Sequence, residues 1–441
     1  MPKPIVAFVG RPNVGKSTLF NRLVGRMESI VSDLPGTTRD RVMGSTTWAN
    51  RELLLVDTGG IETDPEAPLI AQIKYQAQTA VEDADVIVMV VDANDGVTSG
   101  DLEVADLLRR ADRPVVLAAN KADNPSRESL AVEFYELGLS EPIPISAYHN
   151  IGVDDLVSAV IALLPSEEVF GDDESDVKLA IVGRTNVGKS QLINAIANEE
   201  RAIVSDIAGT TRDTLDTLVT HNDKRILVLD TAGIRRRGAI QQGIEKFSVL
   251  RSVRAIERAE VAVVMMDATE VATAQDTHVA GFVTGAYRGV VLGVNKWDLA
   301  EERGITRDNI ERHVKNKFKF TPYAPVCFLS ALKGTGVKEL LDKVCHVRDE
   351  WVKTVPRYAM QRAVLEAVAE NPPPASGRGG GLKIYGIDQS DSGPPTFTFY
   401  LNKPELLHFS YARYLENAIR RTYGYEGTPI RFRLKGRGTK R

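Results

Sequence analysis

The chain has 441 residues, with 55 Lys plus Arg against 59 Asp plus Glu, 43% hydrophobic residues and two cysteines. This length is typical of about three domains, and the composition excludes a disordered, collagen-like or disulfide-scaffold protein. The apolar runs are far shorter than the ~18 residues of a membrane-spanning helix, and the first residues do not resemble a signal peptide, so we expect a cytoplasmic protein.

The first 165 residues alternate short apolar runs with amphipathic stretches. The runs predict strands at 5–9, 53–56, 86–91 and 115–119. Apolar strands that are separated by helical segments indicate a parallel sheet with helices on both faces. We therefore predict a doubly wound α/β domain here.

A glycine-rich segment follows the first predicted strand. It reads GRPNVGKS from Gly10 to Ser17, which matches the pattern GxxxxGK[ST] between a strand and a helix. Such a loop turns backbone N–H groups toward a β-phosphate, and the following helix N-terminus adds its dipole. We expect Lys16 to neutralise phosphate charge and Ser17 to bind Mg²⁺.

Two further segments are suited to sensing a γ-phosphate. Asp57 ends a predicted strand, where it can hold Mg²⁺ through water, and the backbone N–H of Gly60 can reach the γ-phosphate. Thr38, in a Gly-Thr-Thr-Arg-Asp segment, can add a hydroxyl to Mg²⁺ when a triphosphate draws its loop inward. The three residues predict a switch that responds to hydrolysis.

The segment from Asn120 to Asp123, Asn-Lys-Ala-Asp, predicts which base is bound. A carboxylate can accept from both N1–H and the 2-amino group of guanine. Adenine has an acceptor at N1 and no 2-amino group, a mismatch that costs roughly 1–3 kcal/mol or more. Ser146 and Ala147 can supply backbone donors for the guanine oxygen, so we expect this domain to select GTP.

The whole set of motifs recurs after an acidic linker. Residues 165–176 contain six acidic and no basic residues, which is typical of a solvated tether. The glycine-rich loop and the two switch segments then recur at an offset of 173, the base segment at 175 and the Ser-Ala pair at 184. Strands predicted at 179–182, 226–229, 261–266 and 290–294 complete a second doubly wound domain.

The two sets of motifs define the candidate site residues. In the first copy the predicted nucleotide-binding residues are Gly10, Arg11, Pro12, Asn13, Val14, Gly15, Lys16, Ser17, Asp57, Thr58, Gly59, Gly60, Ile61, Asn120, Lys121, Ala122, Asp123, Ser146 and Ala147. In the second copy they are Gly183, Arg184, Thr185, Asn186, Val187, Gly188, Lys189, Ser190, Asp230, Thr231, Ala232, Gly233, Ile234, Asn295, Lys296, Trp297, Asp298, Ser330 and Ala331. The predicted catalytic residues are Lys16, Thr38, Gly60, Lys189, Thr211 and Gly233, and the predicted Mg²⁺ ligands are Ser17, Thr38, Asp57, Ser190, Thr211 and Asp230.

The group that positions the attacking water is not evident. Ras-type enzymes use a Gln for this purpose, but the corresponding residues here are Ile61 and Ile234, which cannot polarise water. These isoleucines could simply pack in the switch, or hydrolysis could rely on another charge near the phosphates. Asn13 and Asn186, inside the two loops, offer side-chain carbonyls suited to a monovalent cation.

The last part of the chain differs in pattern and in charge. A helix at 359–370, strands at 382–387 and 396–401, a helix at 409–422 and a strand at 430–434 predict a small α+β domain. Residues 356–441 contain 14 basic and 7 acidic residues, which leaves 41 basic and 52 acidic residues in 1–355. Six basic residues and no acidic ones fall in 431–441, which favours contact with RNA phosphate over a merely solvated tail.

These residues resemble the Era-like branch of translation-associated GTPases, and the tandem arrangement resembles the Der, or EngA, family over essentially the whole chain. The resemblance implies a first G domain at 1–165, an acidic linker at 166–176, a second G domain at 177–354 and a KH-like domain at 355–441. It implies GTP or GDP and Mg²⁺ at two sites, and a slow hydrolysis that K⁺ stimulates through Asn13 and Asn186. It further implies a monomer that binds the large (50S) ribosomal subunit and rRNA late in subunit biogenesis, without DNA or a membrane span.

Some alternatives stay open from the sequence. The GXXG match at 377–380 lies between a helix and a strand and not between two helices, so it predicts a connector instead of an RNA clamp. The chain could also be an RNA-binding module with structural nucleotides that are not hydrolysed. A third possibility is a GTPase of tRNA modification, although such relatives carry a helical domain for which this chain has no room.

Overall fold

The computed structural model describes residues 3–24, 43–49, 51–60, 69–111, 113–165, 175–199, 216–229, 249–373 and 381–436. The chain divides into two compact units, of which one is built on the first G domain and the other on the second G domain and the C-terminal domain. Within the described ranges, no helix has both the length and the apolar character that crossing a membrane requires.

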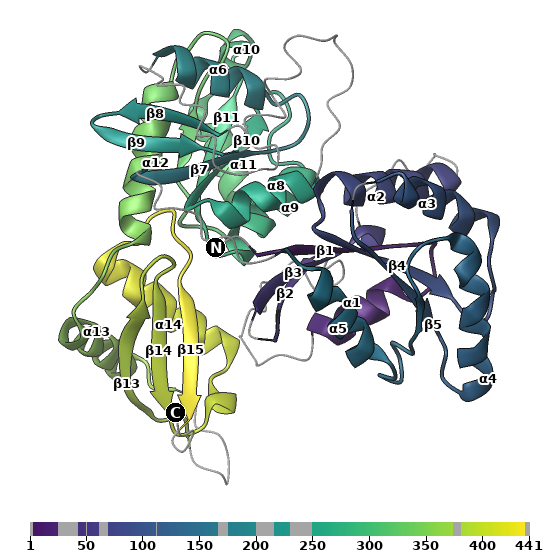
Figure 1. Ribbon diagram of the computed structural model, residues 1–441. Helices are drawn as coiled ribbons and strands as arrows, with labels where there is room; N and C mark the ends of the chain where they lie inside the picture. The colour runs from purple at the N-terminus through teal and green to yellow at the C-terminus, as the bar shows by residue number, and fades with distance from the viewer. Residues whose placement is uncertain are drawn as a thin grey trace. The chain divides into compact units, whose positions relative to one another are not determined.

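The first G domain is a six-stranded sheet between helices (Figure 1). Its strands, in the order β2-β3-β1-β4-β5-β6, pair in parallel except for the edge strand β2, which is antiparallel to β3. The strands are β1 (Ile5–Val9), β2 (Met43–Trp48), β3 (Arg51–Asp57), β4 (Val86–Asp92), β5 (Val115–Asn120) and β6 (Pro142–Pro144). The helices are α1 (Lys16–Val24), α2 (Leu69–Asp83), α3 (Ser99–Arg109), α4 (Pro125–Glu128) and α5 (Val153–Leu163), with short 3₁₀ helices η1 (Thr58–Gly60) and η2 (Ser129–Leu137).

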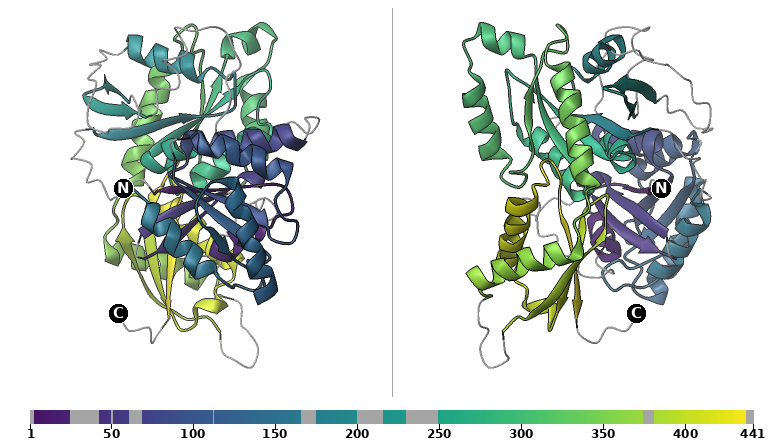
Figure 2. Two further views of the ribbon diagram at one scale, coloured as in Figure 1. Left: turned by 45° about the vertical axis from the view of Figure 1, so that its right-hand side comes forward. Right: turned by 90° about the vertical axis from the view of Figure 1, so that its left-hand side faces the viewer.

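This arrangement confirms the predicted doubly wound fold. Each of the four predicted strands coincides with an observed one or lies inside it. The helices α1 and α5 pack on one face of the sheet, and α2 and α3 cover the other (Figure 2). Apolar residues therefore face helices on both sides, which explains why the strands show no alternation of polar and apolar residues.

The second G domain repeats this architecture, with the strand order β12-β11-β10-β7-β9-β8 and an antiparallel edge strand β8. Its strands are β7 (Val177–Val182), β8 (Thr217–His221), β9 (Lys224–Val228), β10 (Val261–Asp267), β11 (Gly289–Asn295) and β12 (Val326–Phe328). Its helices are α6 (Lys189–Glu199), α8 (Val249–Arg258), α9 (Ala274–Gly285), α10 (Trp297–Glu302), α11 (Arg307–Lys317) and α12 (Val337–Trp351). The strand predicted at 226–229 ends one residue early, although the Leu229 N–H still donates to the Leu179 carbonyl at 2.9 Å.

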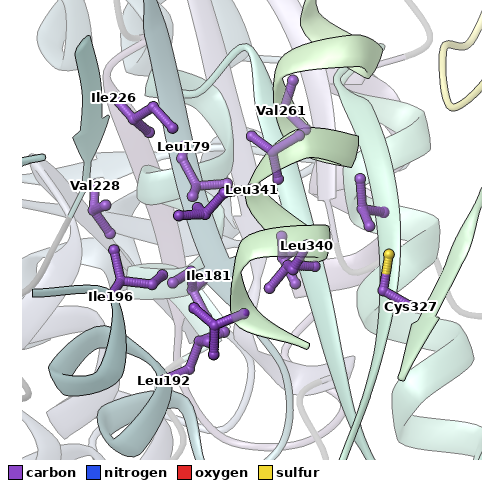
Figure 3. Packing of buried hydrophobic residues seen from close by; sticks show 14 of the residues in the cluster. Leu179, Ile181, Leu192, Ile196, Ile226, Val228, Val261, Cys327, Leu340 and Leu341 are labelled. Atoms are coloured by element: carbon purple, nitrogen blue, oxygen red, sulfur yellow. The ribbon is translucent and has the colours of Figure 1, made fainter. Parts of the chain in front are cut away.

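One core cluster of this domain shows how a helix closes the sheet. Leu340 and Leu341 on α12 are fully buried, and they belong to the same cluster as Leu179 and Ile181 on β7 (Figure 3). Each apolar side chain of this size stabilises the fold by about 1.5–3 kcal/mol when it is fully removed from water. This packing anchors β7 against α12, and β7 leads directly into the second glycine-rich loop.

The C-terminal domain has the predicted order αββαβ. Its elements are α13 (Arg357–Glu370), β13 (Ile384–Asp391), β14 (Thr396–Leu401), η3 (Pro404–Leu406), α14 (Phe409–Tyr423) and β15 (Arg431–Gly436). The strand predicted at 382–387 begins at Ile384 and continues to Asp391, and it pairs with β14 along this length with two register shifts. Both helices pack on one face of the three-stranded sheet, against Phe397, Phe399 and Leu401. The GXXG match at 377–380 and the tail at 437–441 lie outside the described residues.

The C-terminal domain contacts the second G domain through backbone hydrogen bonds. The N–H of Val290, in β11, donates to the carbonyl of Gly427 at 2.7 Å, and the N–H of Gly427 donates to the carbonyl of Tyr323 at 2.8 Å. Gly427 has φ +66°, and a Cβ there would lie 2.3 Å from a methyl carbon of Val347. A side chain at this position would therefore disrupt the contact.

Candidate functional site

The first glycine-rich loop joins β1 to α1 in a conformation that requires glycine. A Cβ on Gly10 (φ +146°) would lie 2.2 Å from the Val90 carbonyl oxygen, and one on Gly15 (φ +98°) would lie 2.2 Å from Asn120 Nδ2. Asn13 has φ +66°, a left-handed conformation that Asn adopts more readily than most residues. The loop is therefore folded tightly at the carboxyl end of a central strand, where parallel α/β sheets bind ligands.

Lys16, the first residue of α1, is buried and folds its side chain back onto this loop. Its Nζ donates to the carbonyls of Gly10 and Arg11, at 2.7 Å each. Burial lowers the pKa of Lys16 to about 8; the nearby Asp57 carboxylate partly opposes this change, and Arg11 adds to it. Anionic phosphate beside Nζ would favour the charged form and raise the pKa again.

This lowered pKa predicts a pH dependence of GDP affinity at the first site. Phosphate binding requires the charged ammonium, which is present below pH 8 and is lost from the nucleotide-free protein above it. We therefore expect GDP affinity to be flat up to about pH 7.5 and about tenfold weaker at pH 9 than at pH 7. Calorimetry on Lys189→Ala, which leaves only the first site, checks this, and binding at pH 9 should take up close to one proton. An affinity that does not change between pH 7 and pH 9 would contradict this role of Lys16.

Ser17 and Asp57 meet beside Lys16. Ser17 Oγ donates to Asp57 Oδ2 at 2.5 Å, and the Gly59 N–H donates to Asp57 Oδ1 at 2.9 Å. Thr58 Oγ1 donates to the Phe8 carbonyl at 2.7 Å, which fixes the end of β3 against β1. A hydroxyl and a carboxylate oxygen that converge in this way are the oxygen ligands that Mg²⁺ prefers, so the residues present fit this ion.

The predicted base segment is tied to the loop by one side chain. Asn120 Nδ2 donates to the Val14 carbonyl at 2.8 Å, and Asn120 Oδ1 accepts from the Ala147 N–H at 2.9 Å. Asn120 thus joins the glycine-rich loop, the end of β5 and the Ser-Ala segment. Asp123 accepts from Arg127 Nη1 with both oxygens, at 2.7 and 2.8 Å. A base that binds to the Asp123 carboxylate must therefore share this carboxylate with Arg127 or displace Arg127 from it.

The second copy repeats these hydrogen bonds. Lys189 Nζ donates to the carbonyls of Gly183 and Arg184 at 3.0 and 2.6 Å. Asn295 Nδ2 donates to the Val187 carbonyl at 2.7 Å, and its Oδ1 accepts from the Ala331 N–H at 2.9 Å. Such repetition 173 to 184 residues apart indicates one function that is present twice.

Several predicted residues cannot be placed. Gly60 ends η1. Two other switch residues of the first copy and all the predicted switch residues of the second copy lie outside the described residues. These are Thr38, Ile61, Thr211, Asp230, Thr231, Ala232, Gly233 and Ile234. Their roles stay predictions.

Sequence reasoning missed two pairs of acidic residues next to these loops. Asp92 and Asp267 end β4 and β10 and form ion pairs with Lys121 and Lys296 of the base segments. Asp101 and Asp276, at the starts of α3 and α9, face the arginines of the glycine-rich loops. Both pairs recur at the offset of 175 that the base segments show, and this signal could have identified them.

Comparison with known proteins agrees with this duplicated site. A family model described as a 50S ribosome-binding GTPase matches residues 5–121 and again 178–296. A second model, described as the KH-domain-like C-terminal part of EngA bacterial GTPase enzymes, matches residues 355–435.

Similar proteins match over nearly the full chain. GTPase Der of Chloroflexus aggregans is 48% identical over 98% of this chain and 97% of its own. GTPase Der of Thermomicrobium roseum is 49% identical over 98% and 95%, respectively. Among solved structures, Era in complex with MgGDPNP and part of 16S ribosomal RNA is 22% identical over 58% of this chain and 91% of its own, with a TM-score of 0.30.

Proposed function

The chain belongs to the GTPase Der family, and from this premise we propose that it hydrolyses GTP at both sites and acts in the biogenesis of the large (50S) ribosomal subunit. The observation that carries the proposal is the duplication of one hydrogen-bonded site, with loop, lysine and base segment, in a chain that ends in a basic KH-like domain. A role on the ribosomal subunit would place the protein in the cytoplasm.

Each site would bind GTP or GDP through its own residues. Lys16 and Lys189 would transfer hydrogen bonds from loop carbonyls to phosphate oxygens, and Asp123 and Asp298 would accept from the guanine edge. Mg²⁺, held by Ser17 and Asp57 and their counterparts in the second copy, would offset phosphate charge. Because these contacts are preorganised, the loops need little rearrangement to bind nucleotide.

We propose that Asn13 and Asn186 place K⁺ beside the phosphates, where the cation would offset charge that develops in the transition state. Both side chains are exposed at left-handed positions of the loops. We expect kcat for GTP to rise at least tenfold when K⁺ replaces Na⁺, and Asn13→Ala with Asn186→Ala to remove most of that rise. Phosphate release in the two salts measures this. Equal rates in K⁺ and Na⁺ would contradict the cation role without affecting nucleotide binding.

The sheet of the C-terminal domain offers a surface for RNA phosphate. In β15, Arg433 pairs with Thr398 and Lys435 with Tyr400, so both lie on the face opposite the helices. Both side chains are exposed, and neither forms an ion pair with any residue in the described part of the chain. Uncompensated cations spaced two residues apart along a strand match the charge of a nucleic acid backbone. We propose that Arg433 and Lys435 contact rRNA.

Co-sedimentation with large ribosomal subunits tests the proposed function. We expect binding in the presence of a GTP analogue to be at least tenfold tighter than with GDP. The double reversal Arg433→Glu/Lys435→Glu should weaken binding at least tenfold and lower the salt dependence by about 1–2 units of log K per log [salt]. The matched reversal Arg357→Glu/Lys338→Glu changes the same charge on exposed residues outside β15 and should have little effect. Equal binding with GTP analogue and GDP would contradict the switch, and an unaffected β15 variant would contradict this surface.

A further inference from the structure

The arginine of the first glycine-rich loop, Arg11, is held by a buried carboxylate. Arg11 Nε donates to Asp101 Oδ1 at 3.0 Å, and its Nη2 reaches Asp95 Oδ2 at 3.3 Å. The Asp101 side chain is 0% exposed, whereas that of Asp95 is 54% exposed. A buried charge is costly unless it is paired, so Asp101 and Arg11 depend on each other.

The orientation of Asp101 is fixed independently of Arg11. Asp101 is the third residue of α3 and forms a capping box with Thr98. Its Oδ2 accepts from Thr98 Oγ1 at 2.6 Å and from the Thr98 N–H at 3.2 Å, while Oδ1 remains for Arg11. One carboxylate thus caps a helix with one oxygen and holds the loop with the other.

This ion pair acts on the backbone that holds Lys16. The Arg11 carbonyl accepts from Lys16 Nζ at 2.7 Å. Arg11 therefore connects α3 through its side chain to the lysine through its backbone. A loop that is fixed before the ligand arrives binds more tightly, because less conformational entropy is lost on binding.

The second copy has the same residues but a looser ion pair. Arg184 Nε lies 3.4 Å from Asp276 Oδ1, and both atoms are buried without a hydrogen-bond partner in the described part of the chain. The guanidinium is instead turned toward Glu270, donating to its side chain and its carbonyl at 2.7 Å each. Thr273 caps α9 with Asp276 as Thr98 does with Asp101. The contact between the arginine and the helix-capping carboxylate is thus closer in the first copy, whereas the arginine of the second copy forms its hydrogen bonds with Glu270.

The two copies differ at one residue beside this ion pair. A Cβ on Gly100 would lie 3.2 Å from Cδ of Arg11, which is tighter than ordinary contact. The equivalent residue of the second copy, at the offset of 175, is Gln275. Glycine therefore leaves room for Arg11 beside Asp101, and the second copy carries a side chain at the equivalent position.

We propose that Asp101 and Asp276 are positioning residues for the two nucleotide sites, and that Gly100 and Gln275 set how firmly each glycine-rich loop is held. The link between the loop and the capped helix is then the firmer one at the first site. This inference rests on the proposed function in that the loops must bind GTP.

Steady-state GTP hydrolysis in a Lys189→Ala background, which reports the first site, provides the test. The loop contacts the same phosphate groups in the ground state and the transition state, so we expect Asp101→Asn to raise KM for GTP about tenfold and to change kcat less than twofold. Arg11→Ala should have a similar effect, and the double variant should be no worse than either single one. A purely structural ion pair would instead lower the melting temperature and kcat while KM stays constant.

Exchanging Gly100 and Gln275 between the copies gives a second test. Each new residue is the one that the other copy already carries at the equivalent position. Gly100→Gln should raise KM at the first site about threefold, and Gln275→Gly, assayed in Lys16→Ala, should lower KM at the second site by a similar factor. Unchanged KM in both exchanges, or an Asp101→Asn effect that persists in Arg11→Ala, would overturn the inference. Absence of GTP binding in the parent backgrounds would contradict the proposed sites themselves, so the two failures are distinguishable.

Discussion

Lys16→Ala is expected to reduce nucleotide binding from two molecules per chain to one. The buried lysine side chain brings a positive charge to the backbone carbonyls at the start of the loop. Removing a buried charge-assisted contact costs about 3–5 kcal/mol, or roughly two to four orders of magnitude in affinity. Isothermal titration with Mg²⁺ and GDP measures both the stoichiometry and the affinity of the remaining site.

The duplication supplies the controls for this experiment. Lys189→Ala should give the same stoichiometry of one, with the first site remaining, and the double variant should bind no nucleotide at micromolar concentration. Lys338→Ala removes an exposed lysine at the start of α12 and should retain two molecules per chain. A Lys16→Ala variant that still binds two molecules would show that Lys16 does not hold phosphate.

The residues of the glycine-rich loops could be predicted because their interactions are local. Gly10, Gly15 and Lys16 lie within seven residues that one strand and one helix hold together. A strand-loop-helix segment of this kind is specified by its own sequence, so a pattern is sufficient to find it. For the same reason, the four apolar strands predicted in each G domain agree with observed strands to within a few residues, whereas the ranges of β2, β6, β8 and β12 were not predicted.

Contacts between distant residues could not be predicted in this way. Asn120 and Val14 are 106 residues apart, and Arg11 and Asp101 are 90 apart, yet each pair is hydrogen-bonded. Such pairs depend on strand order, which periodicity does not give. The contact of Gly427 with Val290 is of the same kind, since the sequence shows only a glycine in a loop and not the strand against which it packs.

Asp298→Asn is expected to change the second site from guanosine to xanthosine nucleotides. Asp298 is the last residue of the base segment, its side chain is only 12% exposed, and Lys333 Nζ lies 3.8 Å from its carboxylate. Guanine presents donors at N1 and at the 2-amino group, which a carboxylate accepts. Asparagine presents one acceptor and one donor, which match the N1–H and the 2-carbonyl of xanthine. We expect GTP affinity to fall by about 10³–10⁵ at this site and XTP to bind in its place, because each mismatch leaves a buried polar group unpaired.

Asp123→Asn should produce the same exchange at the first site, with one difference. There the carboxylate forms a two-oxygen ion pair with Arg127, and asparagine would weaken that pair as well. Xanthosine nucleotide therefore meets less competition at the first site than guanosine nucleotide meets in the wild type. Because each single variant should bind one GTP and one XTP, the two sites can be loaded independently, and binding to ribosomal subunits can be measured with either site in the triphosphate state. A single variant that still binds two molecules of GTP and no XTP would show that these carboxylates do not read the base.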